Sequence, residues 1–198
     1  MTKKEIARSN LDSGKIFLYG EINDKAVRII SEKLRYLVFN KKLKTIYVYI
    51  SSMGGEYEAG CAISDELLGF ESIGIKICTI VVGMACSAAA DILIMGKERY
   101  ATSNSVIMMH PIQYNVESDK LSSVRKDTDF THKHYSAYTE LIAKRCGYKT
   151  KVKIDEFIEK IEKTLWLTAK EAKKMGIIND IYNYKYEDID AYNAEENN

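Results

Sequence analysis

The sequence predicts an α/β fold built on a mostly parallel sheet, because short apolar strands alternate with amphipathic helices along the first half of the chain. A strand expected at residues 15–20 is followed by a helix that has Asn23 or Asp24 as its N-cap. Two further strand and helix pairs follow, with strands at 45–50 and 75–82. Such alternation is typical of parallel sheets, since each helical crossover covers a face of the sheet.

The helices of this half are predicted from apolar residues that recur every three or four positions. The first helix carries Val27, Ile30, Leu34 and Leu37. The second carries Ala59, Ile63 and Leu67. A third helix, apolar in sequence, is expected directly after Ser87.

The second half of the chain adds a strand at 105–110 and then a long polar stretch. Residues 119–146 are compatible with a helix and are charged throughout, so we expect an arm that projects from the core. A further amphipathic helix is predicted from Ile154, Phe157, Ile158 and Ile161. Thr168 and Glu171 form a capping box for a short helix that Gly176 can end.

Composition predicts one globular domain. The chain has 198 residues, of which 46% are apolar and 29% charged, and no internal boundary is evident before an acidic tail. We therefore expect a single domain over residues 1–186 and a disordered tail over 187–198. The net charge of +1, without a basic stripe, argues against nucleic acid or a membrane surface as a partner.

The cysteines and the N-terminal sequence predict a reducing, cytoplasmic location. The four cysteines lack the spacing of a metal site, and Cys61, Cys78 and Cys86 lie in apolar stretches suited to buried thiols. Neither a signal-peptide pattern nor an apolar run of spanning length is present. No metal or cofactor is predicted.

Three segments at strand ends suggest acyl-transfer chemistry. Ser87 stands where a strand passes into a helix, and His110 ends the strand at 105–110. The glycine loop Ser52–Gly55 follows another strand and offers backbone N–H groups to an oxyanion. A serine nucleophile, a histidine base and an oxyanion site are the functions that acyl transfer requires.

Each of these residues also has a purely structural interpretation. Ser87 could be a small residue that lets helices pack closely, since no G-x-S-x-G motif surrounds it. His110 could be an ordinary histidine at a strand end. Gly54 and Gly55 could form nothing more than a tight turn.

Five segments in order resemble the family of Clp protease proteolytic subunits (ClpP), over roughly residues 11–181. Any one of these segments would be weak evidence, whereas five in the family's order are specific. They are Ile16–Ile22, Tyr47–Gly55, Gly83–Ala88, Val106–Pro111 and Leu165–Ala172. The resemblance implies a fold of repeated strand-strand-helix units, shared with crotonases, with a projecting handle helix at about 119–146.

The resemblance also implies roles for individual residues. Ser87 matches the family's nucleophile and His110 its general base and acid. The N–H groups of Gly54 and Ala88 match its oxyanion donors, which agrees with the free N–H expected at a helix start. The charged pair Glu162 and Lys163 falls where the family pairs charges across its ring interface.

The sequence departs from the family pattern at the third catalytic position, where Thr164 replaces an aspartate. A threonine hydroxyl can accept the histidine N–H but cannot stabilise the imidazolium as a carboxylate does. We therefore expect reduced activity, unless a carboxylate such as Asp155 or Glu162 serves His110 instead. Met53 in place of a loop proline, and Ile112 after Pro111, affect substrate positioning more than chemistry.

The function implied by the resemblance is endopeptidase cleavage of unfolded polypeptides inside a self-assembled chamber, by a Ser-His mechanism with a non-standard third residue. The family implies a heptameric ring, two of which can stack through the arm. The sequence lacks a G-x-x-x-x-G-K-[ST] motif, so unfolding would require a separate AAA+ unfoldase ATPase. One alternative is a weak or inactive ring subunit, and another is a crotonase-type acyl-CoA enzyme.

Overall fold

The computed structural model describes residues 2–113 and 121–183. The chain runs through α1 (Lys3–Asp12), β1 (Lys15–Tyr19), α2 (Asp24–Arg35), a π-helical turn (Tyr36–Asn40), β2 (Thr45–Ser52), α3 (Tyr57–Ser72), β3 (Lys76–Cys86), α4 (Ala88–Met95), β4 (Glu98–Ala101), β5 (Val106–Met109), α5 (Leu121–Arg145), α6 (Lys151–Glu162), β6 (Leu165–Thr168), α7 (Ala169–Lys174) and β7 (Asp180–Ile181). The predicted α/β fold is confirmed.

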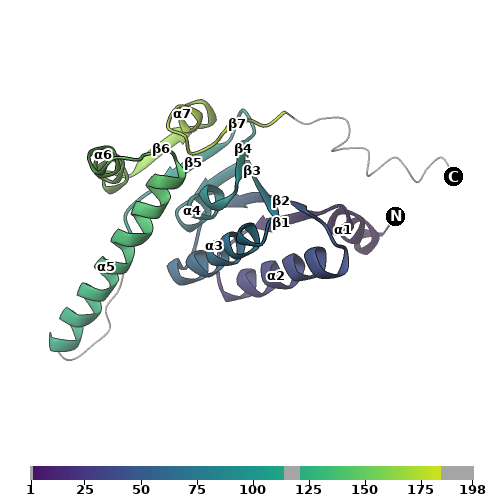
Figure 1. Cartoon of the computed structure of the whole chain (residues 1–198), viewed down its shortest axis with the longest axis horizontal. Coiled ribbons are helices and arrows are strands. Elements are labelled where there is room, and N and C mark those ends of the chain that lie inside the picture. Colours follow the sequence, from purple (N-terminus) through teal and green to yellow (C-terminus); the bar gives the residue numbers. More distant parts are fainter. Residues whose placement is uncertain (1, 114–120, 184–198) are drawn as a thin grey trace.

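The sheet is parallel except at one edge. Its strands lie in the order β1-β2-β3-β4-β7, and every neighbouring pair on this path is parallel. β5 also pairs in parallel with β3, and β6 pairs antiparallel with β5. Helices α2 and α3 lie side by side on one face of the sheet (Figure 1). That face is where Ile16, Leu18, Val48 and Ile50 are buried.

β3 links the two parts of the sheet. Its first half, Cys78–Val81, pairs with β4, and its last residues, Met84–Cys86, pair with β5. Gly83 lies between these halves with φ +89°, a conformation that favours glycine. The last residues of β3 can therefore turn away from β4 and pair with β5, which places Ser87 near the end of β5.

α4 is the central buried helix. All of its residues except Asp91 are buried. It packs against α3 and β3. Because α4 begins directly after Ser87, the hydrophobic core fixes the position of that serine.

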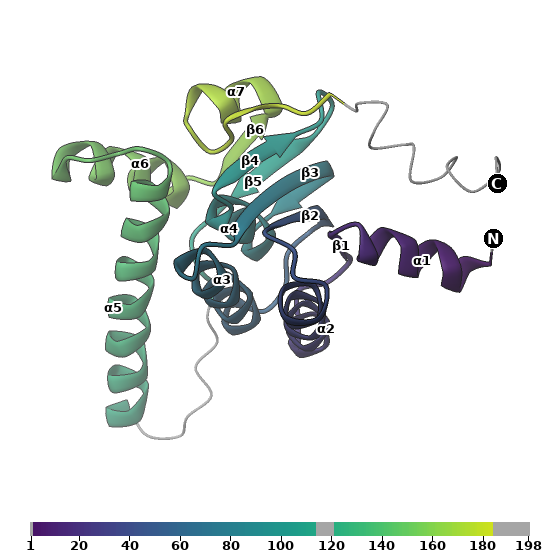
Figure 2. The ribbon, with the colours of Figure 1, turned by 45° about the vertical axis from the view of Figure 1, so that its right-hand side comes forward.

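The arm lies where the sequence places it. α5 extends away from the sheet (Figure 2), and its C-terminal end is anchored by buried Ile142 and Ala143. The first residues of the predicted handle, 119–120, and the acidic tail, 187–198, lie outside the described residues. No helix in the two described ranges is long and apolar enough to cross a membrane.

Most predicted elements are confirmed, with some additions. Asn23 is the N-cap of α2, and Thr168 and Glu171 form the predicted capping box of α7. The sequence patterns did not predict α1, β4, β6 or β7. β4 and β7 have only four and two residues, too few for a periodic pattern to stand out.

Candidate active site

Ser87 occupies a sharp bend between β3 and α4. Its N–H donates to the carbonyl oxygen of Met108 at 2.8 Å, and its own carbonyl oxygen accepts from the N–H of Ala90 at 2.8 Å. The residue has φ 54° and ψ −130°, a strained conformation for a non-glycine residue. Strain of this kind, worth about 1–3 kcal/mol, occurs most often at functional sites. The bend resembles the strand-to-helix elbow of serine hydrolases, although the G-x-S-x-G motif is absent.

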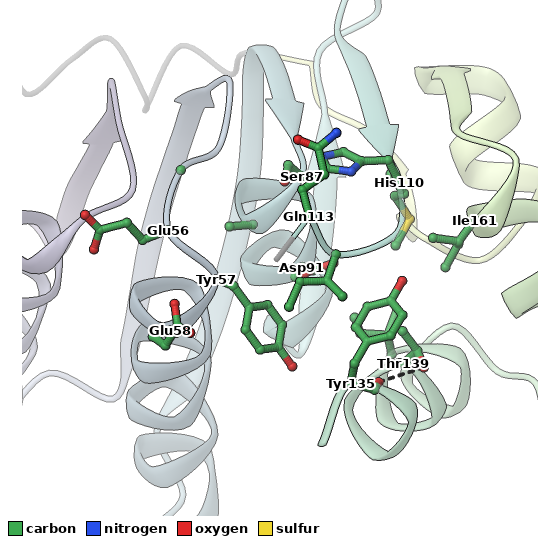
Figure 3. Close-up of a pocket in the computed structure, with 15 residues that line it drawn as sticks. Glu56, Tyr57, Glu58, Ser87, Asp91, His110, Gln113, Tyr135, Thr139 and Ile161 are labelled. Carbon is green, nitrogen blue, oxygen red and sulfur yellow. Dashed lines mark hydrogen bonds between the residues drawn. The ribbon is translucent and has the colours of Figure 1, made fainter. Parts of the chain in front are cut away.

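The pairing of β3 with β5 brings His110 close to Ser87. Cys86 pairs with Met108, so Ser87 and His110 both stand at the ends of adjacent parallel strands. In Figure 3 the two side chains lie at the same side of a pocket, which both residues line. Both are partly buried. The sequence prediction of their proximity is thus supported by the strand register.

The His110 ring is oriented by a backbone carbonyl. Its Nδ1 lies 2.6 Å from the carbonyl oxygen of Pro111. Because a carbonyl can only accept, Nδ1 carries the proton, and the neutral ring presents the lone pair of Nε2. His110 is thereby held in the tautomer that a general base requires.

Thr164 lies opposite His110 in the sheet but outside the pocket. β5 and β6 pair Met109 with Leu165, so the next step of the register places the Thr164 backbone opposite His110. Thr164 is exposed, does not line the pocket, and makes no hydrogen bond to His110 within the described part of the chain. The backbone of Thr164 is therefore next to that of His110, but no hydrogen bond joins the two side chains in the described residues.

Neither of the other predicted acids is placed to replace an aspartate. Asp155 forms an exposed ion pair with Lys151 at 2.8 Å. Glu162 is exposed at the end of α6, and neither residue lines the pocket. Lys163 forms an exposed ion pair with Glu159 at 2.7 Å within this chain.

Gly54 lies directly against the Ser87 bend. A Cβ atom at Gly54 would stand 2.6 Å from the carbonyl oxygen of Cys86 and 2.8 Å from the Cβ of Ser87. Only glycine fits this approach, which the φ of +99° also favours. The Gly54 N–H donates to the Ser52 hydroxyl at 3.0 Å. In this conformation, therefore, that predicted oxyanion donor is already engaged.

The second predicted donor is free of such a bond. Within the described residues, the Ala88 N–H has no hydrogen-bond partner, as is usual in the first turn of a helix. It follows Ser87 directly and lies at the positive end of the α4 dipole. Ala88 can thus stabilise an oxyanion formed by attack of Ser87.

The pocket beside Ser87 has a volume of about 320 Å³, at the small end of the range for ligand sites. Its walls come from the start of α3, the start of α4, the segment after β5, and α5. Tyr57 and Tyr135 face each other with ring centroids 6.4 Å apart. Ile142 and Ile161 add apolar surface. The pocket can therefore enclose one side chain of a bound peptide.

Asp91 also lines this pocket, and the sequence analysis missed it. It lies one helical turn after Ser87, beneath that residue in Figure 3. Burial raises the pKa of its carboxyl to about 7. The available signal was an acid inside the otherwise apolar sequence of α4.

Within the described ranges, no cluster of His, Cys, Asp or Glu could hold a metal ion. The site combines the Ser87 hydroxyl, an oriented imidazole and a helix N–H around one pocket. This combination suits nucleophilic attack on a carbonyl.

Comparison with known proteins gives two matches that cover most of the chain. The family model described as Clp protease matches residues 2–185. A relative described as ATP-dependent Clp protease proteolytic subunit 1, from Rhodopirellula baltica, is 30% identical over 173 residues. That alignment covers 86% of this chain and 73% of the relative.

Proposed function

Because this chain belongs to the Clp protease family of serine peptidases, we propose that Ser87 and His110 cleave peptide bonds in unfolded polypeptides. The observation that carries the proposal is the placement of both side chains on one pocket by the pairing of β3 with β5. The bend at Ser87 supports it, since strained serine positions between strand and helix are typical of nucleophiles.

In the proposed reaction, the Ser87 hydroxyl attacks the scissile carbonyl and His110 Nε2 takes the hydroxyl proton. The imidazolium then gives this proton to the leaving amine, and water completes the cycle through the acyl-enzyme. Throughout the cycle, the Pro111 carbonyl oxygen accepts a hydrogen bond from Nδ1 and so keeps a proton on that nitrogen. As a neutral acceptor, it stabilises the imidazolium less than a carboxylate would.

The oxyanion would be bound first by the Ala88 N–H, which is already available. The N–H of Gly54 is the second proposed donor, and it becomes available when substrate draws it away from Ser52. One such donor contributes about 3 kcal/mol to transition-state stabilisation. Engagement of Gly54 by substrate would therefore couple binding to catalysis.

The proposed site lacks a carboxylate at the third catalytic position, where Thr164 stands. We propose that Thr164 can do no more than accept a hydrogen bond from the His110 ring. Because Thr164 is exposed, we expect slow turnover. The same observation supports a second candidate function, a catalytically weak or inactive ring subunit. A crotonase-type acyl-CoA enzyme is disfavoured because serine and histidine share one pocket.

The proposed assembly is a heptameric ring, with two rings stacked through α5 and the sites enclosed. Exposed apolar side chains on separate elements support burial by other subunits, among them Phe130 of α5, 71% exposed, and Trp166 of β6, 59% exposed. A separate AAA+ ATPase would supply unfolded substrate. A cytoplasmic location is supported by the four cysteines, which are all free thiols.

Labelling by a fluorophosphonate probe tests the nucleophile. We expect the purified, assembled protein to be labelled, and Ser87→Ala to remove the label. Ser72→Ala is the matched control, because Ser72 is an exposed serine at the end of α3. Absence of label on the wild-type ring would favour the inactive-subunit alternative.

A further inference from the structure

The pocket beside Ser87 is acidic. Its described lining residues include the carboxylates of Glu56, Glu58 and Asp91 but no lysine or arginine. Glu56 and Glu58 are exposed at the entrance, whereas Asp91 is only partly exposed. A peptide side chain that enters the pocket therefore meets a carboxyl group deep inside it.

The Asp91 carboxyl has no charged or hydrogen-bonding partner in the described parts of the chain. Its neighbours are the aromatic rings of Tyr57 and Tyr135, and the apolar side chains of Ile142 and Ile161 line the same pocket. An ionised carboxylate in such surroundings is costly unless a cation pairs with it. The protein itself supplies no such cation in the described structure.

We propose that this pocket binds the side chain that precedes the scissile bond and selects lysine or arginine there. The inference rests on the proposed function, since it needs Ser87 as the nucleophile. In serine peptidases, the pocket beside the nucleophile selects this side chain, and a carboxylate at its base selects a basic one.

The shape of the pocket favours a long basic side chain over an apolar one. The aliphatic stem of lysine or arginine can pack between Ile142 and Ile161, and its charged end can reach Asp91. The Tyr57 and Tyr135 rings line the same pocket and add aromatic surface for the stem. A leucine side chain would instead cover Asp91 and leave its carboxyl without a partner.

The selection of lysine or arginine over leucine should depend on pH. The Asp91 carboxyl is the group at the base of the pocket that ionises near neutral pH, as burial raises its pKa to about 7. The other titratable groups facing it ionise at higher pH, because burial also raises their pKa values: Tyr57, Cys61, Tyr135, Tyr138 and Cys146. His110 lines the pocket, His134 bonds Tyr57, and Glu56 and Glu58 stand at the entrance.

The test compares fluorogenic peptides that differ only in the residue before the scissile bond: lysine, arginine, leucine or glutamate. We expect higher kcat/KM for lysine and arginine than for leucine. The ratio of lysine to leucine should rise from pH 6 to pH 8, and the contribution of His110 cancels in this ratio. Asp91→Asn should lower kcat/KM for lysine roughly ten- to a hundredfold and remove the pH dependence of the ratio.

Asp65→Asn is the matched control, because Asp65 is exposed on α3 and does not line the pocket. Fluorophosphonate labelling of each variant reports whether Ser87 remains activated, and Asp91→Leu is a second variant suited to the apolar helix α4. Normal labelling with a preference for leucine, or with an unchanged ratio in Asp91→Asn, would overturn the selectivity proposal alone. Absence of labelling in the wild type would overturn the proposed function and this inference together.

Discussion

Replacing Thr164 by aspartate tests whether the site lacks only a carboxylate. The strand register places the Thr164 backbone opposite His110, and Thr164 has φ +57°. A β-branched residue is strained in this left-handed conformation, whereas aspartate and asparagine tolerate it. Either replacement should therefore fit the backbone better than threonine does.

The size of the effect follows from the partner of His110. In the present site, Nδ1 donates to the neutral carbonyl of Pro111. A hydrogen bond to a charged group contributes about 1.5–3 kcal/mol, against about 0.5–1.5 kcal/mol for a neutral pair. The difference of roughly 1–2 kcal/mol corresponds to a rate gain of about five- to thirtyfold. Because Thr164 is exposed, solvent screening favours the lower end of this range.

The assay is turnover of a small fluorogenic peptide by the assembled protein. Thr164→Asn is the control, since it relieves the same backbone strain without adding a charge. We expect Thr164→Asp to exceed both the wild type and Thr164→Asn in kcat. Equal rates for the aspartate and asparagine variants, in folded rings of equal size, would refute the idea that a missing carboxylate limits catalysis.

Four further outcomes are expected. Thr164→Gly should raise Tm by about 2–4 °C in a thermal melt, because relief of left-handed strain contributes about 1 kcal/mol, and an unchanged Tm would contradict the strained φ. Gly54→Ala should abolish fluorophosphonate labelling, since its Cβ would stand 2.6 Å from the Cys86 carbonyl oxygen, whereas Gly69→Ala, with open space around it, should not. The Asp91 carboxyl has a folded-state pKa near 7, above its ordinary value of 3.8, so the native state binds more protons between these values and its stability falls as pH rises. In urea unfolding, the stability of Asp91→Asn relative to the wild type should therefore rise by at most about 3 kcal/mol between pH 5 and pH 8, and a constant difference would contradict this. Deleting residues 124–130, about two turns of α5, should give smaller species in light scattering, and an unchanged mass would argue against stacking through the arm.

The sequence predicts the framework of the fold well, because its signals are local. Asn23 and Thr168 are caps that act within one turn, and the repeats in α2, α3 and α6 face a single core. The division of β3 between two partner strands could not be predicted, since it depends on pairing with β4 and β5, which lie farther along the chain.

The candidate site was predictable where residues follow strands directly. Ser87 and His110 could be named as candidates because each follows or ends a predicted strand and matches the family pattern, whereas their proximity depends on the pairing of β3 with β5. The hydrogen bonds that the Pro111 carbonyl and the Ser52 hydroxyl accept could not be predicted, because they depend on loop conformation. Asp91 was overlooked since an acid in an apolar helix has meaning only once the pocket around it is known.

The central claim is that Ser87, activated by His110, cleaves peptide bonds, and turnover of a small fluorogenic peptide tests it most directly. The assembled wild type, Ser87→Ala and His110→Ala should be compared at equal concentration. We expect measurable turnover for the wild type and a loss of about a thousandfold or more in both variants, to the level of background. Turnover that persists in a folded, assembled Ser87→Ala protein would contradict the account.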